Sequence, residues 1–188
     1  MLDSSGRVIE VRGTRGSTIP ENGSVLSGTG KAARWLLAHA KARKTINITT
    51  NITSGSALLA PGTGVVNGGP RLLSNSEPDI TAYAEGFVWP ENPEFYYRFG
   101  VRRNPRTLAG VTPEGTLLLV AVDGRQPGYS AGASFEESAR IMRALGAEEA
   151  VNLDGGGSTT ITIGEELMNR PSDPTGERPI GDALVLLQ

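Results

Sequence analysis

Residues 116–122 read TLLLVAV, and this nearly continuous apolar stretch decides the fold. A strand with water on one face alternates apolar and polar residues, whereas a strand covered on both faces is apolar throughout. Thr116–Val122 therefore predicts a strand inside a sheet that has cover on both sides. Ala150–Leu153 predicts a second, shorter strand further along the chain.

A helix is expected between these two strands. Ser134 is a good N-cap, Glu137 completes a capping box three residues later, and Gly146 is typical of the residue that follows a helix end. We predict a helix from Ser134 to about Leu145. A strand, a helix and a strand in this order favour a parallel pair joined by a right-handed crossover. The expected fold class is α+β: a mixed β-sheet with helices packed on it, including a strand-helix-strand unit at about 116–153.

Weaker patterns predict further elements. They are a helix at Thr29–Arg43, a strand at Lys44–Thr53, a short helix near Asp79–Glu85, a hairpin of Thr159–Ile163 with Leu167–Met168, and a terminal strand at Ala183–Leu187. A chain of 188 residues fits one domain with room for two lobes.

Composition excludes several classes of protein. The formal net charge is −2, from 18 basic and 20 acidic residues, so the broad basic field of a nucleic-acid binder is absent. The absence of cysteine excludes disulfides, thiolate metal sites and a cysteine nucleophile. No apolar run is long enough to span a bilayer, and Met1–Val11 lacks the pattern of a signal peptide. The location stays open: secreted or cell-envelope if a longer form carries a signal, and otherwise cytoplasmic.

The stretch Asn152–Thr160, NLDGGGSTT, carries the strongest signal for a functional site. A buried strand ends in an amide and a carboxylate, three glycines follow, and three hydroxyls come after them. Backbone N–H groups of a glycine-rich loop can approach an anion such as phosphate closely. A tight turn with a capping aspartate is the simpler alternative, but it does not require three consecutive glycines. We therefore interpret Gly155–Gly157 as an anion-binding loop and Asp154 as a candidate catalytic group.

Asp123 directly follows the strand at Thr116–Val122. If the two strands are parallel, Asp123 and Asp154 lie at the same edge of the sheet. Two carboxylates are the minimum for cleavage of a glycosidic bond, although an Asp-Gly turn explains Asp123 equally well. No cofactor is required by the sequence, but such a pair of carboxylates could also hold Ca²⁺ or Mg²⁺.

Arginines supply candidate ligands for phosphate, because a guanidinium fork binds two phosphate oxygens at once. Arg106 precedes an apolar stretch, and Arg170 lies in a polar loop that prolines stiffen. We interpret Arg102 and Arg103, by contrast, as part of a solvated turn.

At these residues the sequence resembles the phosphodiester glycosidase family. The resemblance rests on Pro105-Arg106-Thr107, Asp123-Gly124-Arg125, Asn152–Ser158, Asn169-Arg170-Pro171 and Glu177-Arg178-Pro179, in this order. It is specific from about residue 98 to the C-terminus and looser over residues 1–97, where Val65–Pro70 is the best match. It implies a single domain at 1–188, with a loosely matching lobe at 1–97 and a motif-bearing half at 98–188.

The resemblance implies hydrolysis of a sugar-1-phosphodiester, such as an N-acetylglucosamine-1-phosphate diester, which releases the sugar. The candidate catalytic residues are Asp154, Asp123, Arg106, Arg170 and Glu177. The candidate substrate-binding residues are Asn67, Gly68, Gly69, Thr107, Arg125, Asn152, Gly155, Gly156, Gly157, Ser158, Thr159, Asn169, Asp173 and Arg178.

Two hypotheses remain open. One is the hydrolase, and the other is a non-catalytic module that binds a glycan or a phosphate. Family members open with an Asn-Gly-x-Phe-Phe type segment that this sequence lacks, so Met1 is expected to lie inside the family's domain. We expect a sugar-phosphate or glycan substrate and no nucleic acid as partner. Self-association or a further N-terminal segment would complete the domain.

Overall fold

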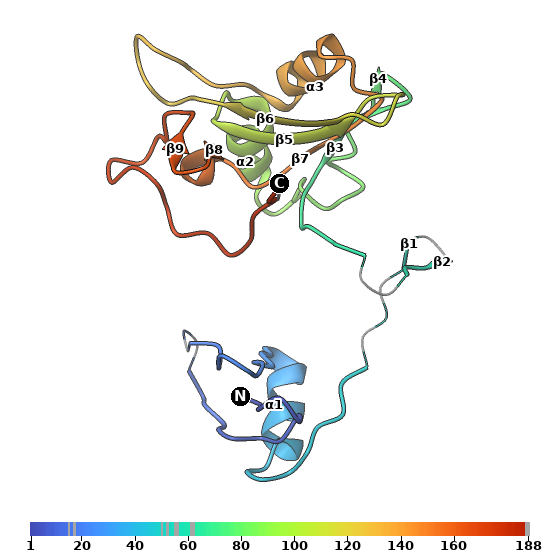
Figure 1. Ribbon diagram of the computed structural model, residues 1–188, viewed down its shortest axis with the longest axis vertical. Coiled ribbons are helices and arrows are strands. Elements are labelled where there is room, and N and C mark those ends of the chain that lie inside the picture. Colours follow the sequence, from blue (N-terminus) through green and yellow to red (C-terminus); the bar gives the residue numbers. More distant parts are fainter. Residues whose placement is uncertain are drawn as a thin grey trace. The chain divides into compact units, whose positions relative to one another are not determined.

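The computed structural model describes residues 1–14, 16, 18–49, 51, 53–54, 57–60 and 63–186. The chain divides into two compact units, Met1–Thr63 and Gly64–Gln188. Residues 64–97 thus belong to the same unit as the motifs (Figure 1). The expectation of one domain at 1–188 stays a prediction.

The first unit contains helix α1 (Gly30–His39). Thr29 occupies the N-cap position as predicted, but its side chain makes no capping hydrogen bond. The helix ends at His39 and not at Arg43, and none of its residues is buried. Tertiary contacts contribute most of the stability of a short helix. Because α1 buries none of its residues, it has few such contacts, and this explains why the helix is shorter than predicted.

The predicted strand at Lys44–Thr53 is wrong in its described part, and Thr50 and Ile52 lie outside the described residues. Only Thr45 forms an isolated bridge, and Thr53 opens the two-residue strand β1 (Thr53–Ser54), which pairs with β2 (Ala57–Leu58). Alternating apolar residues form a strand where a partner strand covers them. In the described part of the unit the segment beside Thr45 ends at Gly6, whose carbonyl accepts from the Ile46 N–H at 2.9 Å, and no partner strand lies beside residues 47–49.

A five-stranded antiparallel sheet forms the centre of the second unit, in the order β4-β3-β7-β5-β6. The strands are β3 (Arg71–Ser74), β4 (Glu77–Pro78), β5 (Arg106–Val111), β6 (Leu117–Val122) and β7 (Glu149–Asn152). The expected α+β class is confirmed, since helices pack on this sheet.

Strands β6 and β7 belong to one sheet, as predicted, but they are not neighbours. Strand β5 lies between them and is antiparallel to both, with Leu108 opposite Val120 on one side and Asn152 on the other. The expected adjacent parallel pair is therefore wrong. The two strands still run in the same direction, so Asp123 and Asp154 follow strand ends at the same edge.

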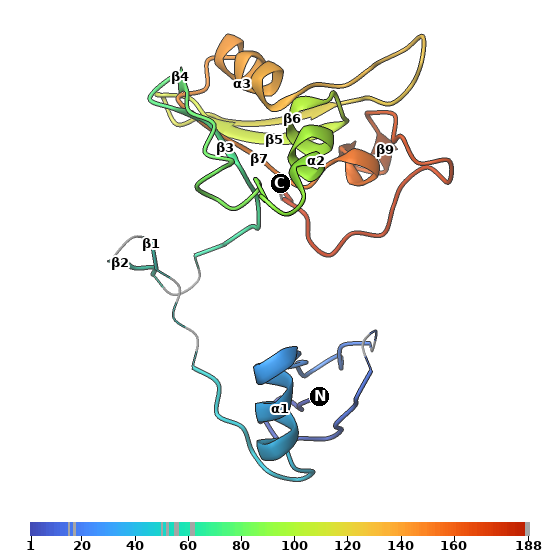
Figure 2. The same cartoon turned by 180° about the vertical axis from the view of Figure 1, so that it is seen from behind.

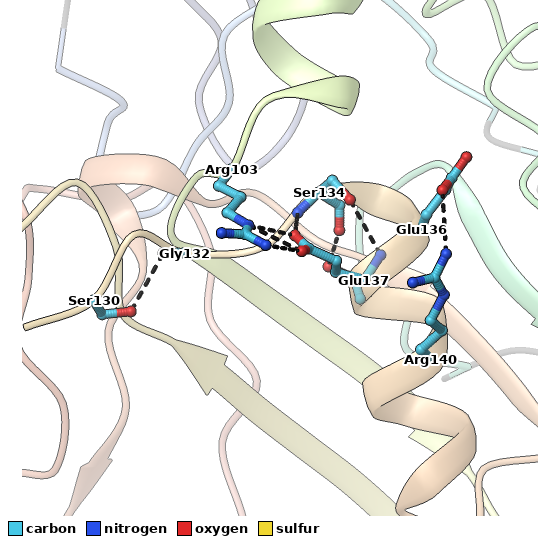
Figure 3. A network of polar contacts seen from close by, with 8 residues as sticks. Arg103, Ser130, Gly132, Ser134, Glu136, Glu137 and Arg140 are labelled. Carbon is cyan, nitrogen blue, oxygen red and sulfur yellow. Dashed lines mark hydrogen bonds and ion pairs between the residues drawn. The ribbon is translucent and has the colours of Figure 1, made fainter.

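Helix α3 (Phe135–Ala144) confirms the predicted crossover helix and covers one face of the sheet (Figure 1). The capping box is formed: the Ser134 hydroxyl accepts from the Glu137 N–H at 3.1 Å, and the Glu137 carboxylate accepts from the Ser134 N–H at 2.9 Å (Figure 3). The buried core joins one face of α3 to three strands; its members are Leu72, Leu73, Leu108, Phe135, Ala139, Met142, Ala147 and Ala150.

Cover on both faces of β6 is not observed. Leu118, Val120 and Val122 pack against the core, whereas Leu117 is 50% exposed and Leu119 is half-buried. The expectation of cover on both faces is thus wrong for the described part of this unit.

The helix expected near Asp79–Glu85 is replaced by turns. Helix α2 (Pro93–Tyr96) forms instead, with proline in its first turn, and continues as a π-helical turn at Tyr97–Val101. Stacked rings connect this segment to the core: Trp89 lies 4.3 Å from Phe95, Phe95 lies 5.5 Å from Phe99, and Phe99 meets Phe135 edge-on at 5.3 Å. Aromatic packing therefore determines where this segment is helical.

The C-terminal part is held mostly by loops. The predicted hairpin is confirmed as β8 (Thr162–Ile163) and β9 (Glu166–Leu167). In both views it lies at the opposite end of the sheet from β4 (Figures 1 and 2). The predicted terminal strand is wrong over Ala183–Leu186, where no strand forms, and Leu187 lies outside the described residues. None of the helices in the described part of the chain has the length and hydropathy that crossing a bilayer requires.

We predict that replacing Glu137 with glutamine destabilises the protein at pH 7 by about 1 kcal/mol, because it removes the ion pair with Arg103 but keeps a capping side chain. The Arg103 guanidinium, together with the Ser134 N–H, lowers the pKa of Glu137 from 4.5 to about 2. A carboxylate whose folded pKa is lowered stabilises above its unfolded pKa and loses that effect as pH falls. The difference between wild type and Glu137→Gln should therefore shrink between pH 4.5 and about 2.

The measurement is urea unfolding across this pH range. Glu136→Gln serves as control, because Glu136 has an exposed ion pair with Arg140 on the same helix (Figure 3). A pH-independent difference for Glu137→Gln would contradict the assignment.

Candidate functional site

The glycine loop follows β7 and is anchored to the start of β5. Gly156 donates its N–H to the Pro105 carbonyl at 2.9 Å, and the loop forms a single 3₁₀ turn at Gly156–Ser158. Gly156 has φ +68°, a conformation that L side chains rarely adopt. A Cβ there would lie 3.2 Å from Nη2 of Arg125, so the Arg125 guanidinium lies directly against the loop.

Gly157 lets a second charged group reach the loop. A Cβ on Gly157 would overlap Oδ1 of Asp173 and Nη2 of Arg178. These two residues form an ion pair, with Nη2 of Arg178 at 2.8 Å from Oδ2 of Asp173. Glycine at position 157 is therefore explained by close approach, and the structure brings Asp173 and Arg178 to the loop as the sequence predicted.

Asp123 binds two loops together. Its carboxylate accepts from the Tyr129 hydroxyl at 3.0 Å, from the Asn169 amide at 3.0 Å and from the Arg170 N–H at 2.9 Å. Asn169 in turn accepts from the Ile161 N–H at 2.8 Å. Three donors on one carboxylate leave it little capacity for proton transfer or for a cation. This geometry favours a positioning role over the catalytic role first assigned to Asp123.

Asp154 is exposed, and its Oδ2 accepts from the Ser158 hydroxyl at 2.8 Å. The same hydroxyl lies 2.8 Å from the Gly155 carbonyl oxygen. Oδ1 of Asp154 has no hydrogen bond to the part of the chain that the structure describes, so one oxygen of this carboxylate faces solvent. Of the two aspartates at this edge, Asp154 is the one available to a substrate.

Arg106 is 1% exposed and is held inside the unit. Its guanidinium donates to the carbonyls of Ala133 at 2.8 Å and Phe99 at 2.6 Å, and it lies 4.4 Å from the centre of the Phe135 ring. Burial, with a smaller contribution from the charge of Arg125, lowers the pKa of Arg106 to about 10. Neither Arg106 nor Arg125 forms an ion pair with a carboxylate among the described residues. The Arg125 guanidinium places positive charge against the loop, whereas the Arg106 guanidinium is turned toward the core.

Asn104 is a site residue that the sequence analysis missed. Its Oδ1 accepts from Nη2 of Arg125 at 2.9 Å, and its Nδ2 donates to the carbonyls of Arg98 and Arg102. Asn104 is buried and so fixes the direction of the Arg125 side chain. The sequence offered one indication of this role, because Asn104 directly precedes the family motif that begins at Pro105-Arg106.

The remaining substrate-binding candidates lie near the loop but are partly used for structure. The Gly69 N–H donates to the Asn152 carbonyl at 2.6 Å, and the Asn152 amide donates back to the Gly69 carbonyl at 2.8 Å. The Thr107 and Thr159 hydroxyls lie 3.5 Å apart. Oδ1 of Asn152 is buried without a hydrogen-bond partner. Gly68 packs against Leu153, which brings the 67–69 segment to the end of β7.

The side chains of three candidate residues make no hydrogen bond to the described residues around the glycine loop. Glu177 and Asn67 are exposed and make no side-chain hydrogen bond to the described part of the chain. The Arg170 guanidinium lies over the Tyr129 ring, 5.2 Å from its centre, and only its backbone joins Asp123. Convergence of Arg106 and Arg170 on one anion stays a prediction.

A metal site has little support from the donor groups. Among the described residues, no three His, Cys, Asp or Glu side chains come together to hold an ion. Because hydrogen-bond donors already occupy the Asp123 carboxylate, the residues present do not fit the Ca²⁺ or Mg²⁺ site considered from the sequence.

Comparison with known proteins identifies the family. The family model for phosphodiester glycosidase matches residues 3–187, and the chain belongs to this family. The mouse enzyme N-acetylglucosamine-1-phosphodiester alpha-N-acetylglucosaminidase is 38% identical over 68 residues, which are 36% of this chain and 13% of the enzyme.

A solved structure is similar over most of the chain. A protein of Burkholderia pseudomallei K96243 that is predicted to be exported is similar with a TM-score of 0.76 and 41% identity, over 96% of this chain and 36% of that chain. The catalytic domain of the zebrafish N-acetylglucosamine-1-phosphodiester alpha-N-acetylglucosaminidase, auto-inhibited by its pro-peptide, has a TM-score of 0.47 and 30% identity, over 59% of this chain and 34% of that chain. The present chain thus spans about a third of the solved Burkholderia protein.

We predict that Gly157→Ala destabilises the protein by about 1–3 kcal/mol, because the new methyl group must displace the Asp173–Arg178 pair. Denaturant unfolding measures the effect. Gly181→Ala is the matched control, since a Cβ at Gly181 meets open space.

A double-mutant cycle tests the cause. In an Asp173→Ala background the overlap with Oδ1 is gone, so Gly157→Ala should cost at least 1 kcal/mol less than in wild type. Equal costs in both backgrounds would show that Asp173 does not set the requirement for glycine.

Proposed function

We propose that this chain hydrolyses a sugar-1-phosphodiester and releases the sugar. The observation that carries the proposal is the Arg125 guanidinium held against the Gly155–Gly157 loop beside an exposed Asp154, in a member of the phosphodiester glycosidase family. A diester phosphate carries one negative charge. The positive charge of Arg125, together with the loop, suits an anion of this kind.

The proposed reaction places water at the anomeric carbon of the sugar. The water oxygen bonds to that carbon, the carbon–oxygen bond to phosphate breaks, and the phosphomonoester leaves with the bonding electron pair. Arg125 stabilises the charge that grows on the leaving phosphate. The free oxygen of Asp154 takes the proton of the water. If Asp154 instead stabilises positive charge on the sugar ring, that proton passes to the departing phosphate.

Asp123, Arg106 and Asn104 act as positioning residues in this proposal. Asp123 holds the 169–170 backbone beside the loop that follows β6, and Asn104 aims the Arg125 guanidinium. Arg106 connects the first residues of β5 to carbonyls of the π-helical turn and the loop before α3. None of these three needs to touch the sugar.

A non-catalytic binding module is the second candidate, and one observation favours it. Glycosidic cleavage ordinarily uses two carboxylates, yet the Asp123 carboxylate is occupied by hydrogen bonds. A phosphate leaving group needs less protonation than an alkoxide, so a single carboxylate is compatible with hydrolysis. For this reason we retain the hydrolase as the first proposal.

Substrate and location follow the relatives as proposals. The mouse enzyme's name supports an N-acetylglucosamine-1-phosphodiester as the first compound to test. The Burkholderia relative that is predicted to be exported supports a secreted or cell-envelope location.

We predict that Asp154→Asn lowers turnover of N-acetylglucosamine-1-phosphate ethyl diester by about a hundredfold or more, because the amide keeps the shape and loses the charge. Released N-acetylglucosamine is the readout, and thermal unfolding shows whether the variant folds. The exposed Asp182→Asn is the matched control. Turnover equal to that of wild type would remove Asp154 from catalysis. Binding of the diester without any turnover by wild type would favour the binding module.

A further inference from the structure

A hollow of about 730 Å³ lies beside the loop that follows β6. Its walls include Arg102, Arg103, Arg125, Gln126, Tyr129 and Ser130. The volume falls within the range of small-molecule sites, roughly 300–1,000 Å³. The hydrolytic step proposed above uses only one of these side chains, Arg125, so the rest of the hollow has no role in it.

The positive charge of the hollow is only partly neutralised. Arg103 is paired with Glu137 at the start of α3 (Figure 3). The side chains of Arg102 and Arg125 have no ion pair within the described residues, and the Arg125 side chain hydrogen-bonds there only to the neutral Asn104. An anion that enters the hollow would therefore meet two guanidinium groups without a competing carboxylate partner.

The backbone of Arg102 is fixed from both sides. Its carbonyl accepts from the Asn104 amide at 3.1 Å and from the Arg106 guanidinium at 3.4 Å, and its N–H donates to the Tyr97 carbonyl at 2.9 Å. A side chain on a fixed backbone loses less entropy when it binds than one on a mobile turn. Arg102 is exposed, as expected for a solvated turn, but its backbone is anchored.

The opposite wall is also rigid. The Tyr129 hydroxyl donates to Asp123, and the Ser130 hydroxyl donates to the Asp123 carbonyl at 2.5 Å. Ser130 also accepts from the Gly132 N–H (Figure 3). The hollow is thus pre-formed between two anchored segments.

Arg125 connects the hollow to the glycine loop. Its guanidinium lines the hollow and lies against Gly156, and its own backbone has φ +57°. A non-glycine residue in this region is strained, and such strain gathers at functional sites. A second hollow, of about 330 Å³, also has Arg125 in its wall, together with Phe95 and Phe99. Arg98 and Glu94 in the same wall neutralise each other as an ion pair. Aromatic rings and little net charge suit an uncharged group such as a sugar.

We propose that the larger hollow is an acceptor subsite, in which Arg102 and Arg125 select a phosphodiester whose acceptor carries a second negative charge. This inference rests on the proposed hydrolysis of a sugar-1-phosphodiester. The phosphate binds beside the Arg125 guanidinium, where that group meets the glycine loop, and the acceptor extends toward Arg102. The substrate class is therefore a sugar-1-phosphodiester with a carboxylate or a further phosphate on its acceptor.

Two matched diesters of N-acetylglucosamine 1-phosphate test the subsite. One carries an ethyl acceptor and the other a carboxymethyl acceptor, so they differ by one carboxylate. Wild type should show about a tenfold higher kcat/KM for the carboxymethyl diester, because a charge-assisted hydrogen bond between Arg102 and the acceptor carboxylate stabilises its complex by about that factor. Arg102→Gln should bring the ratio close to one without lowering kcat/KM for the ethyl diester, and the control Arg140→Gln should leave the ratio unchanged. No preference in wild type, or the same preference in Arg102→Gln, overturns the inference.

A binding measurement separates this inference from the proposed hydrolysis. Calorimetry compares 2-phosphoglycolate with ethyl phosphate, which resemble the two released acceptors. If neither diester is hydrolysed, the proposed hydrolysis fails. The anionic subsite still stands if wild type binds 2-phosphoglycolate about tenfold more tightly and Arg102→Gln binds both alike. Equal or absent binding of the two compounds by wild type overturns the subsite as well.

Discussion

The pairing of β5 with both β6 and β7 is the constraint on which the site depends. Because β5 is antiparallel to each neighbour, the ends of β6 and β7 and the start of β5 meet at one edge. The Pro105 carbonyl can then anchor Gly156, and Arg106 can turn into the core. A slip of one residue in this register would reverse the faces of β5 and place the Arg106 guanidinium on the side away from Phe135.

Elements with strong local signals could be predicted from the sequence. Helix α3 has its capping box, the β8–β9 hairpin has its glycine turn, and the glycine loop follows a buried strand. In each case the residues that determine the structure lie within a few positions of each other. The family motifs likewise gave the correct neighbourhood for Arg125, Asp173 and Arg178.

Properties that depend on distant partners could not be predicted. Strand β5 lies between β6 and β7 because of pairing between segments that are distant in the sequence. The sequence of β6 is equally compatible with β5 or with β7 as its neighbour. In the sequence Asp123 looks equivalent to Asp154, and only the fold shows that Asn169 and Arg170, more than 40 positions away, occupy its oxygens. The burial of Arg106 depends on the carbonyls of Phe99 and Ala133, which no motif specifies.

The site is formed by two parts of the chain, the glycine loop and the segment that carries Arg170, Asp173 and Arg178, and these differ in the number of contacts that attach them to the core. Gly156 is attached to β5, the most completely paired strand, whereas the segment that carries Arg170, Asp173 and Arg178 is held by a few hydrogen bonds. Beyond it, Leu184–Leu186 are exposed. Segments with few buried contacts open at a small fraction of the free energy of global unfolding. Assembly of the site and folding of the sheet are therefore separate equilibria, and a protein with an intact sheet can populate a state in which the anion-binding side has opened.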